Sequence, residues 1–180
     1  MKNLLLLSFC LFTFFSFNAQ TPPSVEDGLL SVNILTPGLE YEYGLTNLTT
    51  LDLRAGSGFA YRKGTFGEGF GVYPVFGAQY RYFYNLGKRL EKGKNISSNS
   101  GNYLALNATI QAGKPIIGDL EYNEGYFGVI GPVWGLQRYY GAGFKLDLNL
   151  GGGYGFNESG GSFFSPIIGL KLGWRLSKKE

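Results

Sequence analysis

The acidic residues are the first place to look for chemistry, because the 180-residue chain contains no histidine and a single cysteine. Without histidine, the usual general base, serine–histidine triads and imidazole metal sites are excluded. Glu40 and Glu42 stand two residues apart on one face of an extended segment, which is the arrangement of a possible acid–base pair. Salt bridges to basic side chains explain the two carboxylates better, and we expect that role for them.

Other motifs are weaker. Asp119, Glu121 and Glu124 cluster in one segment and offer oxygen ligands suited to Ca²⁺, but their spacing matches no EF-hand, so we expect a solvated acidic loop. The glycine-rich stretches at Gly67–Gly71 and Gly151–Gly155 lack the helix and the lysine of a phosphate loop and are predicted to be barrel glycines. We therefore predict no catalytic, metal or cofactor site, and a protein that is not an enzyme.

The N-terminus has the plan of a secretory signal peptide. A basic start at Met1–Asn3 precedes an apolar run at Leu4–Phe17, and Asn18–Gln20 closes the run with a small residue. The run is shorter than the ~20 residues that a membrane-spanning helix needs, although an N-terminal anchor is the alternative. Cys10 lies inside the run after Phe9, which rejects a lipoprotein. We predict a signal peptide at residues 1–20 and one thiol-free domain at 21–180.

Composition narrows the class of that domain. There are 29 glycines, aromatic residues make up 17% of the chain, and charged residues make up 16%, below the usual ~25%. The net charge of +3 is too small to argue for nucleic acid. The length suits a single domain.

Hydrophobic side chains alternate with polar ones along most of the chain. Between Thr50 and Arg62, Leu51 and Leu53 fall on one face while Asp52 and Arg54 fall on the other, and this period of two is typical of a strand. The same pattern predicts about eight strands, at 30–35, 39–45, 50–62, 75–85, 102–113, 130–138, 144–153 and 164–176. Turn residues separate them, at 36–38, 46–47, 63–69, 86–101, 114–125, 141–143 and 157–161.

The strand count depends on the segment Asp27–Gly38. It could form one longer strand with the next segment of the chain, bent at Pro37, which would make the count odd. A closed antiparallel barrel with both ends on one side needs an even count, so we split the chain there. The fold class is then all-β, a single antiparallel up-and-down transmembrane β-barrel of about eight strands.

Three features place the apolar face outside the barrel, toward lipid. Aromatic residues crowd the strand ends around an aliphatic middle, as two membrane interfaces select. The clearest strands have roughly 10–13 residues, enough for a tilted span of a bilayer. The polar face carries small residues and charges of both signs, which suit a narrow interior. We expect acidic and basic side chains to pair inside: Glu40, Glu42, Asp52 and Asp147 with Arg54, Arg81, Lys145, Lys171 and Arg175. Closing the sheet also removes exposed strand edges.

The segment Leu86–Gly101 is the longest predicted turn. Its basic stretch Lys88–Lys94 could be a patch for anionic lipid or a partner, but we expect a solvated, mobile turn. With both ends of the domain on the periplasmic side, this turn would be periplasmic too. The turns at 63–69, 114–125 and 157–161 would face outward.

Two stretches resemble a known family. Gly38–Leu45 with Thr50–Leu53, and Phe163–Pro166 continuing to Leu172–Leu176, resemble the opening and closing strands of small bacterial outer-membrane β-barrel proteins, broadly OmpA/OmpX-like. The resemblance implies a location in the outer membrane of a Gram-negative bacterium. It also implies contacts with outer-membrane lipids and lipopolysaccharide, and insertion by the barrel-assembly machinery. It implies no shared activity, and enzymes of this fold that modify lipid A rely on a histidine.

The expected function is a monomeric, non-enzymatic outer-membrane barrel whose lumen is filled by side chains, with a structural or surface-interaction role and no nucleic-acid partner. One alternative is a narrow, porin-like channel for small solutes. The other is a secreted lipocalin-like barrel that binds an apolar ligand.

Overall fold

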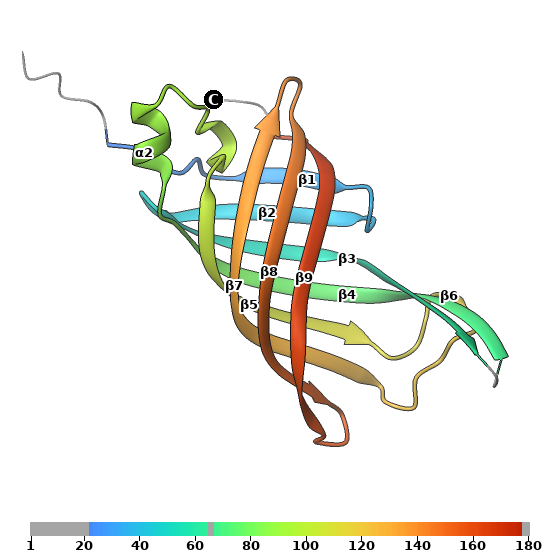
Figure 1. Cartoon of the computed structure of the whole chain (residues 1–180). Helices are drawn as coiled ribbons and strands as arrows, with labels where there is room; N and C mark the ends of the chain where they lie inside the picture. The colour runs from blue at the N-terminus through green and yellow to red at the C-terminus, as the bar shows by residue number, and fades with distance from the viewer. Residues whose placement is uncertain (1–21, 65–66, 178–180) are drawn as a thin grey trace, which may run out of the picture.

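A ring of eight antiparallel strands forms the body of the molecule. The computed structural model describes residues 22–64 and 67–177. The strands are β1 (Leu29–Asn33), β2 (Gly38–Thr46), β3 (Thr49–Gly64), β4 (Gly67–Phe83), β5 (Asn102–Ala112), β7 (Tyr126–Tyr140), β8 (Phe144–Asn157) and β9 (Ser162–Arg175), with a two-residue β6 (Ile117–Gly118) beside β4. Each of the eight ring strands pairs with the next ring strand along the chain, and β1 pairs with both β2 and β9 (Figure 1). The predicted all-β antiparallel fold and the split between residues 33 and 38 are confirmed.

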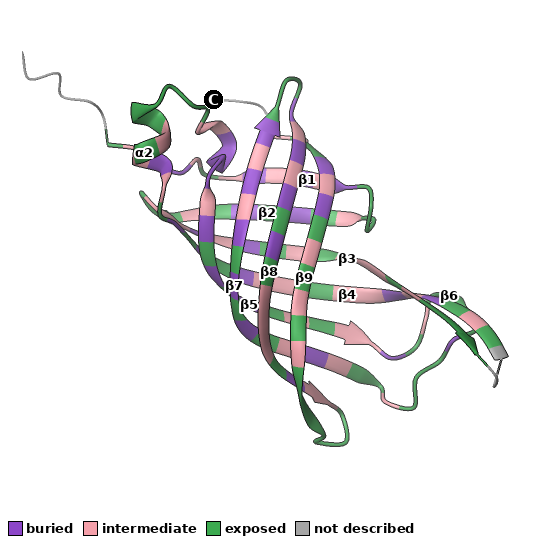
Figure 2. Cartoon of the chain, viewed as in Figure 1, coloured by how far each residue is buried: buried purple, intermediate pink, exposed green. Residues whose placement is uncertain are grey.

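The alternation read from the sequence governs which side chains are covered. Along β5, Tyr103, Ala105 and Asn107 are buried while Leu104 and Leu106 are exposed. Successive residues of a strand point to opposite faces, so one face lines the inside of the ring and the other faces out. Figure 2 shows the resulting bands of buried and exposed residues. The leucines lie outside and the polar residues inside, as predicted.

Tight turns connect the strands at one end of the ring. β2 and β3 are joined by two residues, and β7 and β8 by a turn in which Gly141 and Gly143 adopt positive φ angles of 42° and 93°. A side chain is strained in that backbone region, which is why glycine suits both positions.

The segment 86–101 lies at this same end. Its residues 90–95 are exposed, as the prediction of a solvated turn requires, but the segment as a whole is folded and partly buried rather than a simple turn. It contains α2 (Leu86–Glu91) and the short 3-10 helix η1 (Ser97–Asn99), which fold across the end of the ring (Figure 1). The polar residues Ser98, Asn99 and Ser100 are buried there. We call residues 86–101 the plug and this end of the ring the plugged end. The opposite end, where the β3–β4 and β8–β9 hairpins terminate, is the open end.

Apolar contacts and hydrogen bonds hold the plug. Leu86 belongs to a buried cluster with Val25, Phe83, Tyr103, Ala105 and Val133. The backbone N–H of Ser98 donates to Glu26 Oε1 at 2.7 Å, and that of Glu26 donates to Asn99 Oδ1 at 2.6 Å. These buried polar groups of the plug thus meet a partner from another segment. The sequence alone did not reveal these contacts because the partners lie far away in the sequence.

The ring closes only near the plugged end. β1 has five residues, whereas β3 has 16 and β4 has 17. β9 pairs with β1 through residues 173–175. Leu176 N–H donates to Leu30 O at 2.7 Å on one side of this pairing, and Ile34 N–H donates to Leu172 O at 2.8 Å on the side toward the open end. Beyond it the β3–β4 and β8–β9 hairpins diverge (Figure 1). The prediction that closure removes all strand edges is therefore wrong, because the turn around Pro37 reverses the chain before β1 can cover β9.

Several boundaries differ from the prediction. β3 continues to Gly64 and β4 begins at Gly67, and β7 begins at Tyr126 rather than at residue 130. The glycines in these extensions of β3, β4 and β7 remain in strands because the backbone of the neighbouring strand pairs with them. No helix in the described part of the chain is long and apolar enough to cross a membrane. The predicted signal peptide at residues 1–20 lies outside the described residues.

Candidate functional site

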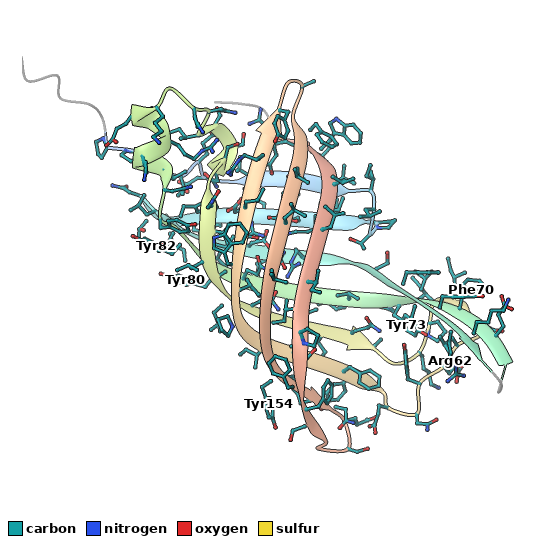
Figure 3. The ribbon with its side chains drawn as sticks, viewed as in Figure 1. Arg62, Phe70, Tyr73, Tyr80, Tyr82 and Tyr154 are labelled. Carbon is teal, nitrogen blue, oxygen red and sulfur yellow. The ribbon has the colours of Figure 1, made fainter. Side chains whose placement is uncertain are left out.

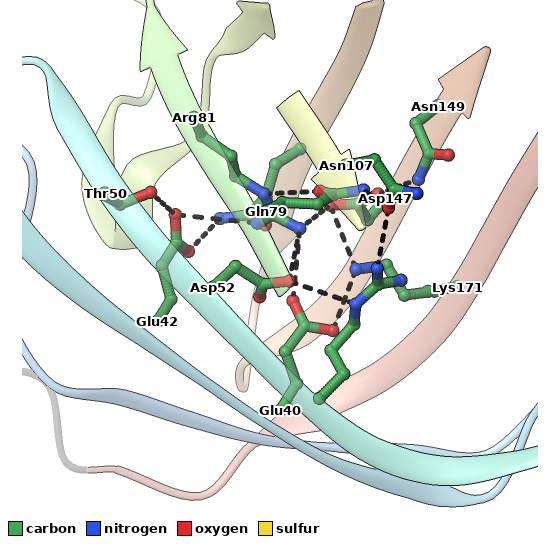
Figure 4. Close-up of polar contacts among 12 residues, drawn as sticks. Glu40, Glu42, Thr50, Asp52, Gln79, Arg81, Asn107, Asp147, Asn149 and Lys171 are labelled. Carbon is green, nitrogen blue, oxygen red and sulfur yellow. Dashed lines mark hydrogen bonds and ion pairs between the residues drawn. The ribbon is translucent and has the colours of Figure 1, made fainter. Parts of the chain in front are cut away.

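A cluster of ionic and amide side chains fills the ring near its plugged end. Its members come from β2, β3, β4, β5, β7, β8 and β9, and those that share a strand are two residues apart or a multiple of two, so they project to the same interior (Figure 4). We call it the polar cluster; it consists of Glu40, Glu42, Thr50, Asp52, Arg54, Gln79, Arg81, Asn107, Gln137, Lys145, Asp147, Asn149 and Lys171.

Arg81 stands at the centre of the polar cluster and is completely buried. Its guanidinium nitrogens lie 3.1 Å from Asp52, 3.4 Å from Asp147, and 3.6 Å from both Glu40 and Glu42. Four carboxylates from three strands therefore face one cation. A planar guanidinium with five donors suits such a position better than an ammonium.

Two lysines and a second arginine balance the remaining negative charge. Lys145 and Lys171 both pair with Glu40, the second at 3.0 Å, and Lys171 also lies 3.7 Å from Asp147. Arg54 Nε lies 3.3 Å from Asp52. The cluster thus holds four carboxylates and four cations, which is what buried charges require because an unpaired one is costly to remove from water.

Amide and hydroxyl groups complete the network. Arg81 donates to Gln79 Oε1 at 2.9 Å and to Gln137 Oε1 at 3.0 Å, and Gln137 donates in turn to Glu42 at 2.8 Å. Thr50 also donates to Glu42, at 2.7 Å. These hydrogen bonds restrict the rotamers of the residues that make them. Asp52 meets Arg54 and Arg81 by ion pairing alone, since neither of its carboxylate oxygens has a hydrogen-bond partner in the described part of the chain.

A layer of aromatic rings lies between the polar cluster and the plug. The Tyr103 hydroxyl donates to Asp147 Oδ1 at 3.0 Å, and its ring lies 4.7 Å from the Arg81 guanidinium carbon, a cation–π geometry. Phe83 packs on Tyr103 with 5.5 Å between ring centres. The sequence analysis did not predict that these rings point inward. Tyr103 is next to the outward-facing Leu104 in the strand, so the alternation of side chains already indicated that its ring faces the interior.

Glu40 and Glu42 take the role expected of them. Both are about 1% exposed, and cations or amides contact both carboxylates. A general acid–base pair must reach a substrate proton, and neither carboxylate has such access here. Of the predicted ion-pairing residues only Arg175 lies elsewhere, 3.8 Å from Glu26 beside the plug.

The loop carboxylates do not converge. Asp119 accepts a hydrogen bond from the Phe70 backbone, whereas Glu124 accepts hydrogen bonds from Ser159. Within residues 22–64 and 67–177, no three side chains of the kinds that hold metals gather at one place. The glycine-rich stretches lie in strands β4 and β8, and a Cβ at Gly151 would lie 2.1 Å from Pro132 O, so close strand packing explains that glycine.

The basic stretch of the plug lies on the outside of the ring. Lys88, Arg89, Lys92 and Lys94 line a pocket of about 240 Å³ together with Arg138. Arg138 donates to Gly101 O at 2.7 Å and Arg89 to Asn95 O at 2.7 Å, so both arginines tie the plug together.

The chain is an eight-stranded antiparallel β-ring, a near-barrel whose interior is filled near its plugged end. Comparison with protein-family models, curated proteins and solved structures gave no match for it. Any functional assignment must therefore come from the distribution of side chains over this ring.

Proposed function

We propose that this protein is a non-enzymatic barrel of the bacterial outer membrane, with a lumen closed by side chains and a structural or surface-interaction role. One observation carries the proposal: apolar side chains cover the outside of the ring and ionic side chains fill the inside.

The outer face is exposed on every long strand. Exposed fractions reach 53% at Leu104 and Leu106, 59% at Leu150 and 77% at Ile168. Soluble monomers rarely expose a contiguous apolar patch of more than a few hundred Å². An apolar outer band is what a strand needs when acyl chains, rather than water, surround it.

Exposed aromatic residues mark both ends of this band. Tyr82 and Tyr80 lie toward the plugged end, whereas Tyr154 and Phe70 lie toward the open end (Figure 3). Tyrosine and tryptophan rings suit the boundary between hydrocarbon and water because they present an apolar body and a polar tip. Their positions support a bilayer crossed by the strands between them.

The interior argues against the lipocalin-like alternative. A barrel that binds an apolar ligand in its lumen needs an apolar cavity, but Arg81, Asp52 and Asp147 are completely buried at the centre of this one. The same cluster, with the plug beneath it, obstructs the path that a channel would need. A closed barrel is the better interpretation, and its exposed loops at the open end are the surface offered to partners.

The proposed surroundings depend on this interpretation. The protein would be a monomer in outer-membrane lipid and lipopolysaccharide, inserted by the barrel-assembly machinery. The plugged end, which carries both ends of the described chain, would face the periplasm.

Extraction and electrophoresis test the location. Membranes from expressing cells are washed with alkaline carbonate, and the purified protein is run on gels with and without boiling. Retention in the membrane and heat-dependent migration are expected. A protein that washes off, and that migrates identically in both conditions, would refute the membrane assignment.

Conductance separates the closed barrel from the channel. The purified protein is added to planar bilayers, and insertion is verified separately by protease protection. We expect no steady openings from inserted protein. Steady openings would replace the closed barrel by the channel alternative.

A further inference from the structure

The pocket that the plug forms on the outside of the ring is lined mainly by basic side chains. Five of its seven lining residues are basic, and the other two are the uncharged Asn85 and Asn102. We call it the basic pocket; its cations are Lys88, Arg89, Lys92, Lys94 and Arg138. The plug supplies four of them and β7 supplies Arg138, so the folding of the plug against the ring brings these charges together.

The cations of the basic pocket have no counter-charge. In the described part of the chain none of the five forms an ion pair with a carboxylate, whereas every cation of the polar cluster does. Glu91 belongs to the same short helix but does not line the pocket. Like charges held close together repel one another, so an anion is favoured among them.

Uncharged oxygens hold the two arginines of the basic pocket in place. Arg138 donates to Gly101 O at 2.7 Å and to Asn102 Oδ1 at 2.6 Å. Arg89 donates to Asn95 O at 2.7 Å, and its Nε has no hydrogen-bond partner in the described part of the chain. Both guanidiniums are therefore positioned while their charge stays unbalanced, and one of them lacks an acceptor. An anion with several oxygens would supply both the charge and the acceptor.

The basic pocket adjoins the apolar outer face of the ring. Arg138 belongs to the outward row of β7 together with Trp134 and Tyr140, which are 40% and 52% exposed. The indole N–H of Trp134 donates to the hydroxyl of Tyr84 at 2.9 Å, and the same hydroxyl accepts from the side-chain amide of Asn102 at 3.4 Å. One lining residue of the pocket thus contacts the aromatic edge of the apolar band. A ligand with an anionic head and an apolar body matches this arrangement.

We propose that the basic pocket binds the headgroup of an anionic phospholipid, with its phosphate at Arg89 and Arg138 and its acyl chains beside Trp134 on the outer face. Guanidinium groups recognise phosphate oxygens with paired, charge-assisted hydrogen bonds. Each further lysine or arginine near an anionic membrane surface adds attraction. An acidic segment of a protein would balance the charges but would leave the adjoining apolar band uncovered. This inference rests on the proposed membrane location.

Quenching by brominated lipids tests the site, because the two tryptophans form a matched pair of reporters. The purified protein with Trp174→Phe reports from Trp134 beside the pocket, whereas Trp134→Phe reports from Trp174 on β9, outside the pocket. Both are reconstituted in phosphatidylcholine vesicles that contain a minor fraction of phosphatidylglycerol, with bromine on the acyl chains of one lipid or the other. Brominated phosphatidylglycerol should quench Trp134 more than its share of the bilayer predicts, and Trp174 only in proportion to that share.

Charge variants identify the residues that hold the headgroup. Lys92→Gln should lower the preference for phosphatidylglycerol about fivefold, the effect of one cation near a membrane surface. Arg138→Gln should lower it at least as much, while Arg138→Lys retains more of it. Lys114→Gln removes the same charge at an exposed position outside the pocket and should leave the preference unchanged. The side chain of Lys92 is exposed and makes no hydrogen bond within the described residues, so its result stands even if Arg138→Gln loosens the plug.

The outcomes separate the inference from the function beneath it. Equal quenching of both tryptophans by brominated phosphatidylglycerol, in protein that brominated phosphatidylcholine also quenches, overturns the site and keeps the membrane location. Loss of the preference in excess inorganic phosphate, compared with chloride at the same ionic strength, assigns the pocket to a soluble anion and overturns the lipid. Absence of quenching by either brominated lipid refutes the membrane location, and the lipid site with it.

Discussion

Removing the Arg81 side chain should destabilise the ring much more than breaking an exposed ion pair. Arg81→Leu leaves Glu40, Glu42, Asp52 and Asp147 facing one cation fewer, so the buried cluster carries an excess negative charge. It also removes two hydrogen bonds and the cation–π contact. Breaking a buried ion network on one side typically costs about 3–5 kcal/mol.

An exposed ion pair supplies the matched control. Lys63 lies 3.3 Å from Glu68 near the β3–β4 turn, with the two side chains 70% and 56% exposed. Lys63→Gln should lower the free energy of unfolding by about 0–1 kcal/mol, as is usual for surface pairs. The comparison isolates burial, because both substitutions remove one cation from an ion pair.

Urea titration of the protein in micelles measures both changes. Fluorescence of Trp134 and Trp174, both on the outer face of the ring, reports unfolding. Adding Asp52→Asn to Arg81→Leu restores the charge balance and should recover part of the loss, with a coupling of about 0.5–3 kcal/mol. If Arg81→Leu proves no more costly than Lys63→Gln, the network does not hold the ring as we describe.

Three further changes test other parts of the structure. Leu106→Arg, on the outer face of β5, should cost about 2–4 kcal/mol of stability in vesicles if this face meets the bilayer core; an unchanged urea midpoint would contradict that environment. Glu26→Gln weakens the contact with Ser98 N–H and should speed hydrogen exchange in residues 96–101, measured by mass spectrometry, whereas the exposed Glu91→Gln should not. Pro166→Val restores an N–H to the free edge of β9 and should increase self-association in sedimentation experiments; a purely monomeric variant would show that this edge is protected in another way.

The alternation of apolar and polar residues was enough to predict most of the fold. The alternation at Thr50–Arg62 and at Asn102–Gly113 predicted strands, and both are strands in the structure. It also predicted that Leu104 and Leu106 face out while Asn107 faces in, which the burial of these residues confirms. A side chain's face depends on its neighbours in sequence, so a single sequence suffices to predict it.

The candidate site was predicted in membership but not in arrangement. Glu40, Asp52 and Lys171 were expected inside with partners of opposite charge, and they are. That Arg81 gathers four carboxylates, with Tyr103 against it, depends on the register between β2, β3, β4, β5 and β8. Register changes which side chains meet without changing the pattern along any one strand.

The plug shows where local pattern fails. Ser98 and Asn99 have the composition of a solvated turn, yet both are buried because Glu26, some 72 residues away, supplies their hydrogen bonds. Polar side chains can be buried when distant partners satisfy them. No property of the segment itself reveals those partners.

By itself the sequence determined that apolar and polar side chains alternate along the chain, that charges of both signs share the polar face, and that about eight strands follow one another. These properties are local, since successive residues of an extended chain must point to opposite sides. The tertiary structure alone decided that the ring closes only near one end, that residues 86–101 plug that end, and that the edge of β9 around Pro166 has no partner strand on one side. Each of these depends on which distant segments meet, because a five-residue β1 can cover only the last residues of β9.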